Sequence, residues 1–534
     1  MHTLSLRTNL ACRDNRAFVW QMEMNRFGIQ LIVCLLLVSS AFGAAPDTKV
    51  QSPAKPISII DARLADTWRL QKIEPAPHAD DAEFLRRVSL DIVGHIPHVT
   101  EVQDFIASTD PDKRRTIVDQ LLADPAYVSH FTNVWREILL TQATAQDLGF
   151  ITNHLEGWLR RRVRENVPYD QWVREILTTP LGNRVAAASD GLTEPTPFPF
   201  YQANELKPEN LTSAVSRVFL GVNLECAQCH NHPFAPWKQE QFWQLSSFFA
   251  GVQRLRPDNG FTAAPEMMDL RQMKMPNSER LVTAKFLDGS EPKFATNQSA
   301  RVQLAEWITS PKNRFFTRAV VNRLWAHFFG RGIVEPLDDL GGTREIVHSQ
   351  LLDDLADRFI ESGYDVKYLI RLITASDAYQ RTSRLTHPSQ KEPGMFARMV
   401  PRGLTAEQLF DSLALATGCR RDFRDDFLTK FNRLDRPTES QTSILQALAM
   451  MNGRLTSDAI SLTESKTVTA LANSPFLTTE RKIAVLFLAT LSREPTATEL
   501  ERYANYLAKN SDQNEALADV FWALLNSSEF MLNH

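Results

Sequence analysis

Apolar residues recur at three- and four-residue spacing through most of this chain. The segment PDKRRTIVDQLLADPAYVSHFTNVWREILL, which starts at Pro111, shows the pattern, and the Asp124–Pro125 pair within it marks the end of one helix and the start of the next. This spacing is that of amphipathic helices, each with one apolar face turned to a core. The pattern predicts helices within residues 57–180, 207–250, 298–382 and 402–530.

Two stretches lose the helical period. Residues 181–206 are rich in Pro and Gly, and residues 251–297 carry Pro, Gly and Asn with a possible short strand in LVTAKFLDG, from Leu281. The sequence therefore predicts a mostly α, multi-helical fold with little β-structure and irregular, loop-rich connections. Two packed helical domains are expected, at 46–250 and 298–534, with residues 251–297 as an irregular linker.

The N-terminal 45 residues have the pattern of a signal peptide. An apolar run at residues 27–38 follows Arg26 and precedes the small residues of SSAFGAAP, and it is too short to span a bilayer. Met24 begins a conventional basic-then-apolar leader, so the start of translation at Met1 is open to question. We expect export to the periplasm or cell surface, with no integral membrane segment left after cleavage.

Composition and charge narrow the class of protein. Of 534 residues, 43% are hydrophobic and 23% charged, which is ordinary for a globular protein, and only 20 are glycine. The net charge of −4 leaves no basic surplus for a phosphate backbone, so nucleic acid is not an expected partner. Two of the five cysteines fall in the leader, and the remaining Cys226, Cys229 and Cys419 are too few for a disulfide framework.

The strongest chemical signal is the Cys-x-x-Cys-His motif formed by Cys226, Cys229 and His230. This spacing attaches c-type haem, because two thiols on one turn can form thioethers with the vinyl groups while the adjacent imidazole ligates iron. The motif follows a helical run and lies in a chain expected to be exported, where such attachment occurs. Phe234 and Trp237 follow closely and are candidates to pack against the haem.

The same residues allow two other interpretations. One is a disulfide between Cys226 and Cys229, and the other is a zinc site using both cysteines with His230 and His232. Four ligands within seven consecutive residues would crowd a tetrahedral ion, so zinc would need ligands from elsewhere. If haem is bound, the candidates for a second axial ligand are His327 and the methionines of PEMMDLRQMKMP, namely Met267, Met268, Met273 and Met275.

Several stretches resemble one family, the planctomycete cytochrome-type proteins that pair two domains of unknown function. The first is cytochrome-like and the second planctomycete-specific. The similarity lies in FLRRVSLDIVGHIP from Phe84, YDQWVREILT from Tyr169, RVFLGVNLECAQCHNHPFAPW from Arg217, NRFFTRAVVNRLWAHFFGRGIVEPLDDL from Asn313, ESGYDVKYLIRLITASDAYQRTS from Glu361, QALAMMNG from Gln446 and DVFWALLNSSEFMLNH from Asp519. The signature residues that match are Cys226, Cys229, His230, His232, Pro233 and Trp237, then Arg318, Asn322, Arg323, Trp325, His327, Gly330 and Arg331. The chain lacks the separate cytochrome domain and carbohydrate-binding-like insert of longer members.

Two helical segments within these motifs are also interpretable by themselves. Arg87 and Asp91 are four residues apart and can pair, while Gly94 is a candidate for a left-handed helix cap before Pro97. The helix around Arg318 to His327 presents polar groups on two faces. These groups fit either a buried arginine network at a domain interface or the binding of an anion such as a haem propionate.

We therefore expect an exported mono-haem c-type protein acting in electron transfer, alone or within a periplasmic oxidoreductase, with an exported redox or scaffold protein as partner. The alternatives are a non-redox binding or scaffold protein with a zinc or disulfide clip, and an enzyme or accessory protein of polysaccharide degradation. The sequence has no Gly-x-Ser-x-Gly, phosphate-loop or His-Glu-x-x-His motif, so whether the chain is an enzyme stays open. Adjacent acids such as Asp338–Asp339 and Asp353–Asp354 more often form solvated faces or caps than catalytic pairs.

Overall fold

The structure is a computed structural model of the chain. It describes residues 54–140, 145–182, 194–256, 259–342, 346–419, 424, 427–428 and 461–534. The expected leader at 1–45 and the alternative start at Met24 lie outside the described residues. In the described part, no helix combines the length and apolar character needed to cross a bilayer.

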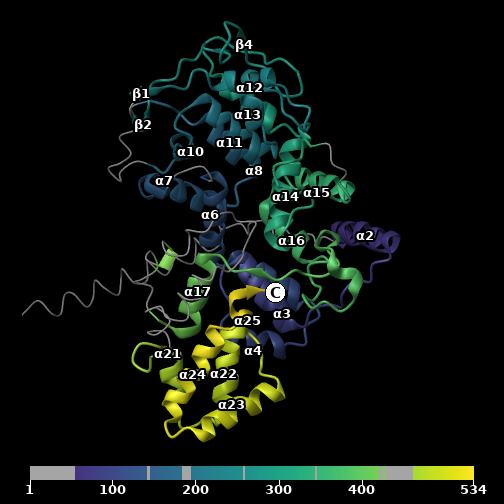
Figure 1. Cartoon of the computed structure of the whole chain (residues 1–534), viewed down its shortest axis with the longest axis vertical. Coiled ribbons are helices and arrows are strands. Elements are labelled where there is room, and N and C mark those ends of the chain that lie inside the picture. The colour runs from purple at the N-terminus through teal and green to yellow at the C-terminus, as the bar shows by residue number, and fades with distance from the viewer. Residues whose placement is uncertain are drawn as a thin grey trace, which may run out of the picture. The chain divides into compact units, whose positions relative to one another are not determined.

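The first half of the chain consists mainly of successive helices (Figure 1). They are α2 (Ala54–Gln71), α3 (Asp81–Ile92), α4 (Val99–Ala107), α5 (Lys113–Ala123), α6 (Pro125–Leu139), α7 (Ala145–Arg164), α8 (Tyr169–Thr178), α10 (Pro199–Ala203), α11 (Pro208–Leu220) and α12 (Gln239–Ser246). The Asp-Pro pair acts as the sequence predicts, because Asp124 caps α6 by accepting from the Ala126 amide at 2.7 Å and Pro125 is its first residue.

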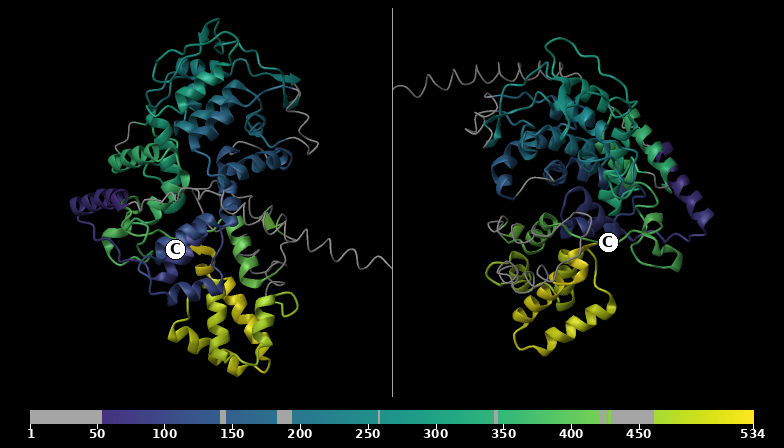
Figure 2. Two further views of the ribbon diagram at one scale, coloured as in Figure 1. Left: turned by 180° about the vertical axis from the view of Figure 1, so that it is seen from behind. Right: turned by 45° about the horizontal axis from the view of Figure 1, so that its top comes forward.

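The second half is also helical (Figure 1). Its helices are α13 (Ala300–Ile308), α14 (Arg314–Phe329), α15 (Ser349–Glu361), α16 (Val366–Thr374), α17 (Ala406–Thr417), α21 (Lys466–Ala472), α22 (Thr479–Leu491), α23 (Ala497–Lys509), α24 (Gln513–Leu525) and α25 (Ser528–Met531). Near the C-terminus, α22, α23 and α24 pack together and appear in yellow tones in Figure 2. The expected mostly helical fold is confirmed, with about 4% of residues in strands.

Buried apolar side chains form two clusters. Among the described residues, one cluster runs from Ile60 to Met399, within and on both sides of the expected linker, with Leu488 added, and the other joins Leu90 and Ile96 to residues 409–530. Helix α3 contributes to both, since Phe84 and Val88 lie in the first cluster and Leu90 in the second. The apolar packing is therefore continuous across residues 251–297, and the domain boundaries expected there stay a prediction.

Residues 251–297 contain two short antiparallel hairpins, β1 (Arg254–Arg256) with β2 (Asn259–Ala263) and β3 (Gln272–Lys274) with β4 (Leu281–Thr283). The strand expected from Leu281 is thus present as β4. Between the hairpins, Glu266 pairs with the buried Arg301 of α13, whose Nε donates to Glu266 Oε1 at 2.9 Å. The segment is irregular, as predicted, but a buried ion pair ties it to the helices.

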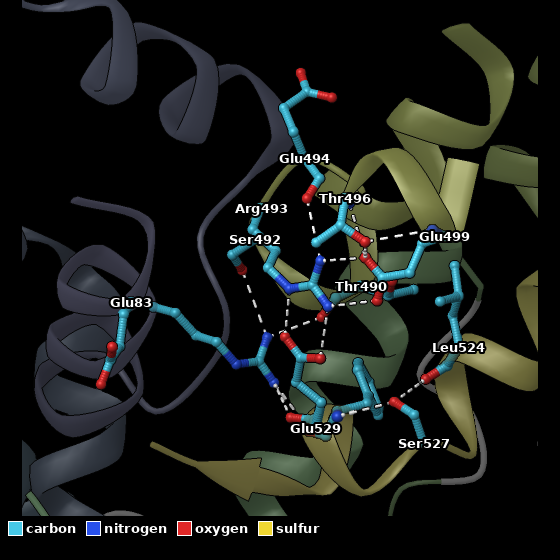
Figure 3. Close-up of polar contacts among 12 residues, drawn as sticks. Glu83, Thr490, Ser492, Arg493, Glu494, Thr496, Glu499, Leu524, Ser527 and Glu529 are labelled. Atoms are coloured by element: carbon cyan, nitrogen blue, oxygen red, sulfur yellow. Dashed lines mark hydrogen bonds and ion pairs between the residues drawn. The ribbon is translucent and has the colours of Figure 1, made fainter. Parts of the chain in front are cut away.

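The C-terminal helices are tied to α3 by Arg86, whose side chain is fully buried. Its guanidinium donates to the carbonyl oxygens of Thr490 at 2.8 Å and Phe530 at 3.0 Å. Beside it, Arg493 lies between the carboxylates of Glu499 and Glu529 (Figure 3), with N–O distances of 2.6–2.9 Å. The two hydrogen bonds from Arg493 to Glu499, with further ones from Thr496, hold the pKa of Glu499 down to about 2.

The expected pair between Arg87 and Asp91 is not the one that forms. Arg87 instead pairs with Glu83 at 2.7 Å, one turn earlier on α3. Asp91 accepts from Tyr379 Oη at 2.7 Å and from Asn533 Nδ2 at 2.6 Å, and it pairs with Arg402. The helical spacing allowed the pair, but partners brought in from distant segments compete for the same carboxylate.

Candidate functional site

The Cys-x-x-Cys-His motif lies in a loop between α11 and α12, within residues 207–250, where the spacing predicts helices with short connections. Helix α11 ends at Gly221, which takes a left-handed conformation with φ of +62°. Only a short 3₁₀ turn, η2 (Glu225–Gln228), follows before α12. The helical run expected through Glu225 therefore ends earlier, at Leu220, and residues 221–238 connect α11 to α12, although the 3₁₀ turn keeps Cys226 and Cys229 one turn apart.

Both thiols and the motif histidine are accessible to solvent. Cys226 and Cys229 are exposed and unbridged, and His230 is exposed as well. The His230 amide donates to the Cys226 carbonyl at 3.4 Å, so the histidine follows the first cysteine by a single turn. All three side chains of the motif are therefore exposed at the surface rather than packed in the interior.

The hydrogen bond made by the His230 ring suits a metal ligand. Its Nδ1 lies 2.7 Å from the carbonyl oxygen of Asn231, and because a carbonyl can only accept, Nδ1 carries the proton. In the neutral ring Nε2 then keeps its lone pair and points away from this contact. Histidines that ligate metals almost always donate their other ring N–H in this way.

His232 has the opposite arrangement. Its Nδ1 accepts from the amides of Phe234 at 3.2 Å and Ala235 at 2.9 Å, so the neutral ring carries its proton on Nε2. The His232 amide also donates to the Trp237 carbonyl at 2.8 Å. Neither ring nitrogen offers a lone pair to a metal in this conformation, and His232 shapes the turn that follows the motif.

Helix α12 supports the motif from within the same half of the chain, a role that the sequence did not reveal. Gln239 Nε2 donates to the carbonyls of Gln228 at 3.3 Å and Cys229 at 2.9 Å. Trp243 Nε1 donates to the Gln228 carbonyl at 3.0 Å, and the Gln239 amide donates to Asn231 Oδ1 at 3.0 Å. These bonds satisfy the backbone of the 3₁₀ turn and fix where the two thiols emerge.

Trp237, expected to pack against haem, makes its observed contacts elsewhere. Its ring lies against Phe315 of α14, with 6.3 Å between ring centroids, and against Gly341. Phe234, the other candidate, is 84% exposed. The assignment of Trp237 to a haem stays a prediction, while its packing joins the motif loop to the second half of the chain.

The residues present have the groups that attachment of a c-type haem needs, and they fit a zinc site less well. Haem attachment needs two accessible thiols and an imidazole with a free Nε2, and Cys226, Cys229 and His230 meet both requirements. A zinc site would draw on His232, whose ring nitrogens are committed as described. Among the described residues, no three or more His, Cys, Asp or Glu side chains are gathered as a metal would need.

The methionine candidates for a second axial ligand lie near the β3–β4 hairpin. Met267 is half exposed and its sulfur accepts from Gln253 Nε2 at 3.2 Å. Met273 and Met275 are partly buried against the first apolar cluster. These contacts are those of packing residues, and a methionine as second ligand stays a prediction.

His327, the other candidate, is held in a different part of the fold. Its Nε2 lies 2.8 Å from the Asp91 carbonyl, so that nitrogen donates its proton and cannot ligate iron. The ring packs against His130 and Phe131 of α6, with ring centroids 5.6 Å and 5.4 Å away. The structure therefore gives His327 the role of a hydrogen-bonded structural histidine.

This histidine pair predicts an acid-labile fold. Burial lowers the pKa of His130 and of His327, so unfolding releases rings that take up protons more readily. The contribution to stability is complete above about pH 6.5 and falls by up to about 1.4 kcal/mol per ring at pH 5.5. Urea unfolding at pH 7.5 and 5.5 measures the loss, which His130→Gln should reduce; His78→Gln, at an exposed histidine, should leave it unchanged.

Three polar signature residues of α14, Arg318, Asn322 and Arg323, bond to protein groups of other segments, as in the buried-network interpretation. Arg318 binds Asp353 with both Nε and Nη2, at 2.7 Å and 2.5 Å, and Arg323 donates to the Arg217 carbonyl at 2.7 Å. Asn322 exchanges two hydrogen bonds with the Val334 backbone, at 2.9 Å and 3.0 Å. These three side chains therefore connect α14 to α11, to α15 and to the loop that follows α14.

Comparison with known proteins gives two matches, in the same order as the resemblance seen in the sequence. Residues 59–254 match PSCyt2, a protein of unknown function (DUF1549), and residues 300–422 match PSD1, a protein of unknown function (DUF1553). No curated protein and no solved structure is significantly similar to the chain. The chain therefore pairs the two planctomycete cytochrome-type domains, PSCyt2 and PSD1, in that order.

Proposed function

We propose that this protein is an exported mono-haem c-type protein that transfers electrons, with Cys226 and Cys229 as attachment points and His230 as the proximal ligand. The observation that carries the proposal is the His230 ring, whose Nδ1 is 2.7 Å from the Asn231 carbonyl while Nε2 stays available. The name of the PSCyt2 family, cytochrome-like, agrees with it.

The residues of the loop would each do part of the work. A bound haem supplies one-electron transfer at the iron. The Asn231 carbonyl keeps the proton on Nδ1 of His230, which fixes the ring orientation and increases its basicity as a ligand. Gln239 and Trp243 hold the carbonyls of the 3₁₀ turn, so the thiols keep the spacing that attachment at two positions requires.

The exposure of the motif favours exchange with another protein. Cys226, Cys229 and His230 are all exposed, so a group attached there would lie at the surface within reach of a partner. We therefore propose an exported redox protein as partner and a periplasmic or cell-surface location. The chain would act as a carrier or as the electron-transfer part of an oxidoreductase.

The test is a pyridine haemochrome spectrum with a haem stain on a denaturing gel, on protein exported in a host that has a cytochrome c maturation system. The wild type should carry covalent haem that dithionite reduces. Cys226→Ala and Cys229→Ala should each abolish or strongly reduce the stain, because a thioether is lost. Cys419→Ala, the same change at a cysteine outside the motif, should stain like the wild type.

Colourless but folded wild-type protein would contradict the proposal. Metal analysis and thiol counting would then separate the two scaffold alternatives. Bound zinc with two thiols protected from modification would indicate a zinc site, and two fewer thiols without zinc would indicate a disulfide. Turnover of a polysaccharide by colourless protein would favour the carbohydrate alternative.

A further inference from the structure

The loop that carries the Cys-x-x-Cys-His motif is held at both ends by one short segment of the PSD1 region, residues 336–342. At the first end, the Asn223 amide donates to the Asp338 carbonyl at 2.8 Å, and the Leu340 amide donates to the Gly221 carbonyl at 2.9 Å. Val222 and Asp339 form an antiparallel bridge between the same two stretches. The motif thus starts three residues after a backbone pairing with the second family's region.

The other end of the loop is held by side-chain packing. The ring of Trp237 covers Gly341 so closely that a Cβ at position 341 would lie 2.7 Å from Trp237 Cζ2 and 3.0 Å from Nε1. A Cβ at Gly221 would likewise lie 2.6 Å from Leu340 Cδ1. Both glycines are therefore required by close approach, and the two contacts interlock the loop with segment 336–342.

These contacts reach the motif through short connections. The Trp237 carbonyl accepts from the His232 amide at 2.8 Å, and His232 Nδ1 in turn receives the Phe234 and Ala235 amides. On the other side, Asn223 Oδ1 accepts from the Glu225 amide at 3.0 Å, which starts the 3₁₀ turn. A shift of either end would therefore be passed to Cys226 or His230 within one turn of chain.

We infer that segment 336–342 of the PSD1 region, through Gly341 and its contact with Trp237, is the positioning element of the Cys-x-x-Cys-His loop. The motif belongs to PSCyt2, but its conformation depends on PSD1. No hydrogen bond joins segment 336–342 to either thiol, so Gly341 and Trp237 act on the motif through the loop and are positioning residues. The consequence for haem attachment rests on the proposed function, whereas the effect on the loop does not.

The test compares Gly341→Ala with Gly394→Ala in haem-free protein by amide hydrogen exchange. Position 394 is a matched control in the same region, since a Cβ there would meet only the ends of the Glu392 and Arg331 side chains, at 3.3 Å and 3.5 Å. Gly341→Ala should speed exchange of the Asn223 and His232 amides at least about tenfold, because their hydrogen bonds lose support. Gly394→Ala should leave both amides as in the wild type.

Two further measurements separate positioning from loss of folding. Circular dichroism and the unfolding temperature should show that Gly341→Ala still folds. Trp237→Phe should then rescue it, because the smaller ring lacks the atoms that the new methyl group meets, and exchange in the double variant should return toward the wild-type rate. If Gly341→Ala exchanges like the wild type, or if Gly394→Ala changes the same amides, the inference is wrong.

Covalent attachment gives a spectroscopic readout on the same variants. Gly341→Ala should lower the haem stain per folded chain at least threefold relative to Gly394→Ala, and Trp237→Phe should restore it. A wild type that takes no haem would overturn the proposed function but leave the exchange result standing. Faster exchange with unchanged haem yield would overturn the extension to haem while keeping the positioning of the loop.

Discussion

Replacing Asp91 by alanine is expected to lower the free energy of unfolding by about 3–5 kcal/mol, the cost of breaking a buried ion pair by removing one partner. Asp91 is 1% exposed and accepts from Tyr379 and Asn533 besides pairing with Arg402. The variant removes the acceptor of the Tyr379 hydroxyl and of Arg402 Nη2, and the Arg402 guanidinium keeps its bond to the Phe328 carbonyl. Thermal and urea unfolding, with probes in both parts of the chain, would measure the loss.

The position of Asp91 explains why one carboxylate should matter to so much of the fold. It lies on α3 between Leu90, which packs in the C-terminal apolar cluster, and Ile92, which packs in the other. Asp357→Ala is the matched control, because its partner Arg314 lies at the surface and such pairs contribute about 0–1 kcal/mol. Equal destabilisation by the two variants would contradict the central role of Asp91.

Replacing Arg301 by methionine should lower the free energy of unfolding by a similar amount, about 3–5 kcal/mol. The reason is that the buried carboxylate of Glu266 would be left without its partner charge. Arg301 is 2% exposed, and besides Glu266 it donates to the Leu177 and Thr179 carbonyls and to Tyr201 Oη, each at 2.9 Å. Burial opposes the ionised carboxylate, but the hydrogen bonds and charge of Arg301 outweigh it and lower the pKa of Glu266.

A second substitution distinguishes an unpaired charge from lost packing. In the double variant Arg301→Met with Glu266→Gln, no charge is left buried, so part of the stability should return. Arg358→Met, at a surface arginine paired with Glu361, should cost less than about 1 kcal/mol and serves as the control. The single variants Arg301→Met and Glu266→Gln are measured as well. If the double variant loses as much free energy of unfolding as the two single variants together, the unpaired charge is not the cause.

Much of the fold follows from local patterns in the sequence. The three- and four-residue spacing predicts the helices, and the Asp124–Pro125 pair and Gly94, whose φ is +79°, mark ends that the structure confirms. These features depend on hydrogen bonds and packing within a few residues, which is why the sequence alone shows them. The helical run before the motif ends earlier than expected, at Leu220, because apolar residues such as Val222 and Leu224 pack in a loop rather than on a helix face.

The candidate site also has some features that the sequence shows and others that depend on the tertiary structure. The spacing of Cys226, Cys229 and His230 indicated a haem motif without any structure, whereas the different tautomers of His230 and His232 depend on where the following carbonyl and amides lie. In the sequence, Gly341 is recognisable only as the first of two glycines that follow Asp338, Asp339 and Leu340, which does not indicate a special role. Its importance becomes visible when the Trp237 ring is seen to fill the space above it.

The sequence by itself determined the helical class, the order of the PSCyt2 and PSD1 regions and the presence of the Cys-x-x-Cys-His motif, because each is encoded by neighbouring residues. Only the tertiary structure decided the partners of Asp91, the hydrogen bond of His327 and the contacts of PSD1 segment 336–342 with the Cys-x-x-Cys-His loop. A carboxylate or a ring has many possible partners along a chain of this length. Which of them it meets depends on packing between segments hundreds of residues apart, and no local pattern records that.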